Sequence, residues 1–110
     1  MRKIESQMNE AISTNANWQS ANTSVHYNEE NDTSLIRLHG NLIAEVDDNS
    51  IKLYDGGYQS NTTKSRLNAI LATHGVDGER VFAKNFEWFV RLWNGTEFFT
   101  TEFRSGMRLA

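Results

Sequence analysis

The amino-acid sequence predicts a two-layer α+β domain, in which an antiparallel β-sheet of about five or six strands packs against two helices. Two segments place apolar residues at helical spacing, and several short runs rich in β-branched and aromatic residues alternate with polar turn clusters. The 110 residues show no repeat and no change of character that would mark a boundary, and this length buries enough apolar surface for one core. We therefore expect a single domain, residues 1–110, with the element order α-β-β-β-β-α-β-β.

The first helix is expected over residues 2–13. Its apolar side chains recur at i, i+4, i+7 and i+8, which places them on one helical face: Ile4, Met8, Ala11 and Ile12. The following segment, residues 15–24, is rich in Asn, Ser and Thr, which favour turns by competing for backbone hydrogen bonds. It is predicted to be a connector in which Trp18 covers the core.

Four strands are expected next, over residues 23–27, 34–39, 42–46 and 50–54. Polar clusters divide these runs, and Gly40-Asn41 lies between the second and the third. Glycine at the first central position suits a type II′ turn, because glycine adopts positive φ freely. The four strands are predicted to form an antiparallel meander.

The second helix contains the stretch TTKSRLNAIL and follows a loop with two glycines. Thr62 or Thr63 is the expected N-cap, because a hydroxyl there accepts a hydrogen bond from a free first-turn amide. The shared apolar face consists of Leu67, Ile70, Leu71 and His74. Gly75 is expected in the left-handed conformation that often ends a helix.

The last third predicts a β-hairpin, because FEWFVRLW and TEFFTTEF flank Asn94-Gly95, a preferred type I′ turn. That turn would pair Trp93 with Thr96. One face of the hairpin then reads as core: Phe86, Trp88, Val90, Leu92, Phe99 and Phe103. The other face carries Phe89, Arg91, Trp93 and Phe98. Residues 80–84 offer one further short strand.

Composition narrows the function classes. The chain has no cysteine, which excludes a disulfide, a thiolate zinc site and a cysteine nucleophile, and its formal net charge is −3. The N-terminal run MRKIESQMNEAIS starts with basic residues, but polar side chains interrupt any signal-peptide core, and no run reaches membrane-spanning length. A soluble protein of the cytoplasm, with no membrane partner and no cofactor, is expected.

Catalysis is not expected either. His26, His39 and His74 are far apart in sequence and form no metal-binding motif, so neither a metal site nor a catalytic residue is assigned. The acidic stretch around Asp47 lacks the alternating ligands of a calcium loop. A small enzyme or nucleotide binder near His39 and Glu45 stays as an alternative.

Two candidate binding surfaces remain. The start of the second helix combines outward amides, the positive end of the helix dipole, hydroxyls and bases, which suits an anion or a nucleic acid. Its residues are Thr62, Thr63, Lys64, Ser65 and Arg66. An ordinary helix cap contains the same hydroxyls, although Lys and Arg oppose the dipole at that end.

The second surface is the hairpin face of Phe89, Arg91, Trp93 and Phe98. Aromatic rings beside arginine are typical of protein interfaces and also stack nucleic-acid bases, whereas a covered face would be a second core. The acidic balance of the chain disfavours nonspecific duplex binding. The partner classes that remain open are another protein, a nucleic acid and a second copy of the chain.

Four segments of the sequence carry a resemblance to known proteins: LHGNLIAEV, IKLYDGGYQSNTTKSRLNAIL, the closing FRSGMRLA and the MRKIESQMNEAI start. Together they resemble a family of small proteins from tailed phages, notably those that infect cyanobacteria. The resemblance implies a phage origin and expression inside a bacterial host, and it assigns no catalytic residue. The leading interpretation is a noncatalytic phage accessory protein that binds a host or phage protein, with nucleic-acid binding through residues 62–66 as an alternative.

Overall fold

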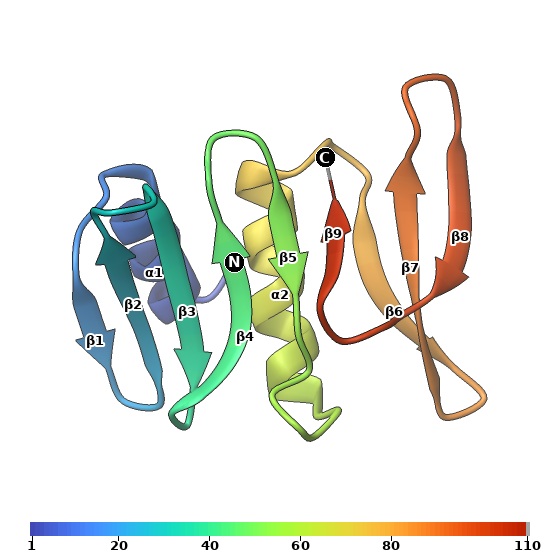
Figure 1. Cartoon of the computed structure of the whole chain (residues 1–110). Helices are drawn as coiled ribbons and strands as arrows, with labels where there is room; N and C mark the ends of the chain where they lie inside the picture. Colours follow the sequence, from blue (N-terminus) through green and yellow to red (C-terminus); the bar gives the residue numbers. More distant parts are fainter. Residues whose placement is uncertain (110) are drawn as a thin grey trace.

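The structure, a computed structural model, describes residues 1–109 and confirms the α+β class (Figure 1). Within these residues, two helices and nine strands follow one another along the chain. Their bounds are α1 Lys3–Ser13, β1 Trp18–Ser20, β2 Thr23–Asn28, β3 Thr33–Leu38, β4 Asn41–Val46, β5 Ile51–Leu53, α2 Asn61–His74, β6 Arg80–Lys84, β7 Glu87–Trp93, β8 Phe98–Glu102 and β9 Met107–Leu109.

The strands divide between two antiparallel sheets. Sheet A has the order β1-β2-β3-β4-β5-β9, and sheet B has the order β6-β7-β8. The four-strand meander predicted from the sequence is the centre of sheet A, and both helices lie behind this sheet in Figure 1. The polar segment predicted as a connector instead contains β1, because Trp18 pairs with Val25 and the strand continues to Ser20. β9 adds the opposite edge by pairing with β5.

The β3–β4 turn is centred one residue earlier than predicted. Leu38 pairs with Asn41, so the two central residues are His39 and Gly40, with φ of +52° and +78°. Positive φ at both central positions is the geometry of a type I′ turn, whose twist matches that of the flanking strands. A bulge then shifts the register beyond Arg37, and it leaves Ile43 and Ala44 buried in succession.

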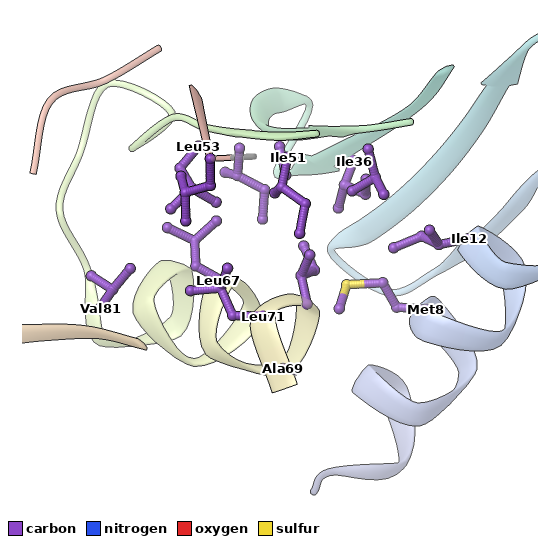
Figure 2. Packing of buried hydrophobic residues seen from close by; sticks show 14 of the residues in the cluster. Met8, Ile12, Ile36, Ile51, Leu53, Leu67, Ala69, Leu71 and Val81 are labelled. Atoms are coloured by element: carbon purple, nitrogen blue, oxygen red, sulfur yellow. The ribbon is translucent and has the colours of Figure 1, made fainter. Parts of the chain in front are cut away.

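Helix α2 forms the centre of the core. Leu67, Ile70 and Leu71 are fully buried members of the core cluster. Met8 and Ile12 of α1 belong to the same cluster (Figure 2). The predicted apolar face of α2 is therefore correct for its three aliphatic residues. Burial of such side chains contributes roughly 1.5–3 kcal/mol each to folding.

Both predicted ends of α2 need correction. Ser60, rather than Thr62 or Thr63, is the N-cap, and its side chain accepts a hydrogen bond from the Thr63 amide at 3.1 Å. Gly75 has φ −90° and ψ −171°, an extended conformation rather than a left-handed one. A Cβ at Gly75 would lie 2.8 Å from the Leu71 carbonyl oxygen, so close approach of the backbone explains this glycine.

The β7–β8 hairpin forms as predicted but in a register shifted by two residues. Trp93 pairs with Phe98 rather than Thr96, because the turn is centred on Gly95-Thr96. The Asn94 side chain makes this turn by accepting hydrogen bonds from the amides of Thr96 and Glu97. Since strand side chains alternate with a period of two, an even shift leaves each residue on its predicted face.

Two members of the predicted core face are nevertheless exposed. Phe86 is 104% exposed because it lies at positive φ in the β6–β7 turn, beyond the end of the strand. Phe99 is 42% exposed because β8 is the outermost strand of sheet B. Trp88, Val90 and Phe103 are buried as predicted.

A side chain of α2 occupies the edge of sheet B at β6. Asn68 donates through Nδ2 to the Val81 carbonyl oxygen at 2.9 Å and accepts through Oδ1 from the Val81 amide at 2.7 Å. The amide side chain thus replaces a neighbouring strand at that position, which satisfies two main-chain groups beside a buried residue. This contact ties α2 to sheet B.

Replacing Asn68 with Ala is expected to leave both Val81 main-chain groups without their partner and to lower the free energy of unfolding by about 2 kcal/mol. Urea titration measures the change. Asn61→Ala makes the same substitution at an exposed position of the same helix, so it is the matched control and should stay close to wild type. Equal midpoints for the two variants would contradict a stabilising role for Asn68.

Candidate functional site

The start of α2 is a structural cluster rather than an open anion site. Arg66, one of its two predicted bases, is buried and forms an ion pair with Glu5 of α1, with Nη1 2.8 Å from Oε2. Its Nε donates to Thr23 Oγ1 at 3.0 Å and its Nη2 to Asn22 Oδ1 at 3.3 Å. Ser65 donates to the same Glu5 oxygen at 2.7 Å. The charge that was expected to attract an anion is already neutralised inside the protein.

The other predicted residues of this site are also engaged or shielded. Thr63 is buried, and its hydroxyl shares a hydrogen bond with Ser60. Thr62 and Lys64 are half-buried. Of the two bases in residues 62–66, only Lys64 is left to meet an external phosphate, so the geometry disfavours this surface for nucleic acid.

Substitution of Arg66 and of Lys64 should have different effects on stability. Arg66→Ala leaves the Glu5 carboxylate buried without its partner, so we expect it to lower the free energy of unfolding by about 3–5 kcal/mol. Lys64→Ala is expected to change it by no more than about 0.5 kcal/mol. Chemical denaturation measures both changes.

The double variant Glu5→Met/Arg66→Met removes both charges and should recover most of the stability lost in Arg66→Ala, because apolar pairs often replace buried ion pairs without loss. An Arg66→Ala variant as stable as Lys64→Ala would contradict the interior placement of Arg66.

The structure does not bring His39 and Glu45 together. His39 is exposed in the β3–β4 turn, whereas Glu45 lies farther along β4 and pairs with Leu35 and Lys52. The Tyr54 hydroxyl donates a hydrogen bond to Glu45, and this bond raises the pKa of Tyr54 to about 12. A hollow of about 90 Å³ beside His39 is not lined by Glu45. No acid–base pair is assembled from these two residues.

The acidic turn between β4 and β5 is stabilised by hydrogen bonds within the turn itself. Asp47 accepts hydrogen bonds from the amides of Asn49 at 2.8 Å and Ser50 at 2.7 Å, and these bonds lower the pKa of its carboxyl. Among residues 1–109, no group of three or more His, Asp or Glu side chains is arranged to hold a metal ion.

His74, at the end of α2, lies beside a hollow of about 200 Å³ that Asp47 and Asp48 also line. Burial lowers the pKa of His74, and its buried Nε2 has no hydrogen-bond partner in the part of the chain that the structure describes. Burial at the end of α2 therefore favours the neutral form of the imidazole over the charged form.

The lowered pKa of His74 predicts a loss of stability in acid. Because the unfolded chain binds the proton more readily than the folded chain, this contribution is complete above pH 6.5, the ordinary pKa, and decreases as the pH falls below it. Unfolding free energies across that range should fall less steeply for His74→Leu than for wild type. His26→Leu, at an exposed position, is the matched control and should keep the wild-type slope.

The second predicted surface is a continuous aromatic face on sheet B. Register places Arg80 beside Arg91, Phe82 beside Phe89, and Trp93 beside Phe98. We call these six residues the aromatic face. Arg80 and Phe82 were not among the predicted site residues, although alternation within RVFAK would place them on this side of a strand paired with β7.

Ring contacts organise the aromatic face. Phe82 stacks on Phe89 with centroids 5.8 Å apart, and Trp93 meets Phe98 edge-on at 5.0 Å. The Arg91 guanidinium carbon lies 4.0 Å from the Phe98 ring centroid. Such pairs stabilise one arrangement of the rings, so the side chains of this face are ordered by their own contacts.

The aromatic face is not a second core. Trp93 is 38% exposed, and the other five members are half-buried or exposed. The half-buried rings of Phe82, Phe89 and Phe98 are not among the side chains packed against the hydrophobic core cluster, whereas Trp88 and Val90 on the opposite side of β7 belong to it. The rings of this face are therefore open to solvent on one side.

The charge of this side of sheet B is mixed. Lys84 joins the two arginines, but Glu87 and Glu102 lie on the same side of the sheet. Binding of a nucleic-acid backbone depends on several uncompensated bases. The arrangement is closer to the composition of protein interfaces, in which aromatic rings and arginine are enriched.

Fold and site together define a small α+β protein with two antiparallel sheets, one of which presents an ordered aromatic face to solvent. The chain belongs to the family of Kyanoviridae Gp96 proteins, whose family model matches residues 1–110. This membership confirms the resemblance to cyanophage proteins. The comparisons with curated proteins and with solved structures found no match. Neither helix within residues 1–109 combines the length and apolar character needed to cross a membrane.

Proposed function

We propose that this phage protein is a noncatalytic accessory protein that binds a host or phage protein through its aromatic face in the cytoplasm of the infected bacterium. The observation that carries the proposal is the open, ordered set of rings and guanidinium groups on sheet B. Trp and Arg are the residue types that contribute most binding energy at protein interfaces. The rings of the aromatic face do not belong to the hydrophobic core, so packing of the core does not explain their presence.

The geometry also supports a rigid docking surface. The rings lie on paired strands rather than on loops, and Arg91 is held over Phe98. A surface that is already ordered loses little side-chain entropy on binding. A solvent-facing sheet with this composition suits a complementary apolar patch bordered by carboxylates, which would meet Arg80 and Arg91.

The two alternative functions receive less support. A nucleic-acid site at residues 62–66 would need Arg66, whose guanidinium is committed to Glu5. The arginines of the aromatic face lie among carboxylates, and the net charge of the chain is −3. An enzyme that uses His39 and Glu45 would need the two side chains together, whereas Glu45 hydrogen-bonds with Tyr54 and does not line the hollow beside His39.

Affinity capture tests this proposal directly. Immobilised wild-type protein, Trp93→Ala and Tyr58→Ala are exposed to lysate of infected cells with and without nuclease. Tyr58 is the matched control, because it is a 77% exposed aromatic residue outside the aromatic face. We expect a partner protein that wild type and Tyr58→Ala retain after nuclease treatment and that Trp93→Ala loses.

With the purified partner, Trp93→Ala should weaken binding by about 2 kcal/mol, as expected for a residue at the centre of an interface. Circular dichroism should show that the variant is folded. Capture that disappears with nuclease would instead support nucleic-acid binding, and equal capture by Trp93→Ala would contradict a role for the aromatic face.

A further inference from the structure

The outer edge of sheet B differs from the other sheet edges of the protein. β8 spans five residues, Phe98–Glu102, whereas the edge strands of sheet A, β1 and β9, span three residues each. The opposite edge of sheet B is occupied by Asn68, but β8 pairs with β7 alone within residues 1–109 and lies at the outer end of the fold in Figure 1. Short, covered or charged edges resist strand addition, and β8 has neither a short length nor a cover.

The main-chain groups on this edge are free to bond. Hydrogen bonds from Asn94 N to Glu97 O and from Phe103 N to Trp88 O mark the two ends of the β7–β8 ladder. Because bonded pairs in an antiparallel ladder alternate, odd-numbered residues of β8 direct their amide and carbonyl groups toward β7. Phe98, Thr100 and Glu102 therefore direct theirs outward, and none has a hydrogen-bond partner in the described residues.

We propose that β8 pairs with β8 of a second copy of the chain, antiparallel about a two-fold axis at Thr100. Thr100 then faces its own counterpart, and Phe98 of each copy faces Glu102 of the other. All three outward residues fall at positions where antiparallel neighbours exchange both main-chain hydrogen bonds. The two sheets B become one continuous six-stranded sheet, and strand addition of this kind is a recurring mode of association.

Charge complementarity favours a second copy as the occupant. Arg91 lies over Phe98, and neither Arg91 nor Glu102 is within ion-pair distance of an opposite charge among the described residues. In the proposed register, Glu102 of the second copy lies beside Phe98 and on the same face as Arg91. Because of the two-fold axis, the dimer contains this pair of opposite charges twice: Glu102 of each copy lies near Arg91 of the other.

Burial of apolar surface on the other face of sheet B, opposite the aromatic face, also favours pairing with a second copy. Phe99 is 42% exposed, and the register places Thr101 of the second copy opposite it. Pairs of this kind, without main-chain bonds between the two residues, have their side chains closest together. Association would cover a phenylalanine that the monomer leaves in water, while the aromatic faces of both copies would lie on one side of the joined sheet.

Sedimentation equilibrium over a concentration series tests the pairing. Wild type is expected to approach twice the monomer mass as concentration rises. Thr100→Pro removes an outward amide that the monomer does not use, and it should weaken association about tenfold or more. Thr100→Val keeps the amide and is the matched control, with association close to wild type.

Charge exchange gives an independent readout. Glu102→Arg should weaken association, and adding Arg91→Glu in the same chain should restore it, because the two charges are exchanged in both copies. Hydrogen exchange should show slower exchange of the Phe98, Thr100 and Glu102 amides as wild-type concentration rises. A wild-type protein that stays monomeric up to about 1 mM, or a dimer that Thr100→Pro leaves intact, would overturn the proposal.

Discussion

The buried Arg66–Glu5 ion pair is the interaction on which the relative placement of the two helices depends. The guanidinium uses its nitrogens on three partners, Glu5 of α1, Thr23 of β2 and Asn22 just before it. A buried charge is stable only where its hydrogen bonds are satisfied, so these directional contacts permit few other orientations of α1, α2 and β2. Asn9 adds to the same interface by donating to the Ala69 carbonyl oxygen at 3.0 Å.

Helix α2 is enclosed on three sides, by α1, by sheet A and by strand β6. Its aliphatic residues face sheet A, Arg66 faces α1, and Asn68 bonds the edge of β6. Such a helix lacks a broad polar face, and its sequence accordingly mixes buried polar and apolar residues. The Asn68 contact also explains why sheet B has one satisfied edge and one free edge.

The position of sheet B determines which of its faces meets solvent. One side of the sheet contributes Val81, Trp88 and Val90 to the core, and the helices are already committed to that core and to sheet A. Nothing in the described chain remains to cover the other side, so the rings there pack against one another and against arginine. Both the aromatic face and the free outer edge of strand β8 follow from this shortage of covering elements.

Local sequence patterns determined most of the elements and their faces. The period-two runs and the helical spacing of Leu67, Ile70 and Leu71 predicted α2 and the strands other than β1 and β9, because periodicity reports which side of an element is buried. The pairing of FEWFVRLW with TEFFTTEF was also correct in its faces, although its turn was misplaced. Asn94 uses its side chain to start the turn rather than occupying a central position, and the dipeptide pattern does not distinguish these roles.

Only the tertiary structure decided which polar residues are internal and which aromatic residues are external. TTKSRLNAIL places Lys64 and Arg66 at the positive end of a helix dipole, an unfavourable position for a base. For Arg66, the carboxylate of Glu5, about sixty positions earlier in the chain, offsets this unfavourable placement. Likewise, alternation assigned Phe89 and Phe98 to one face but could not say whether another layer covers it. Both outcomes depend on contacts between segments distant in sequence, which local periodicity does not encode.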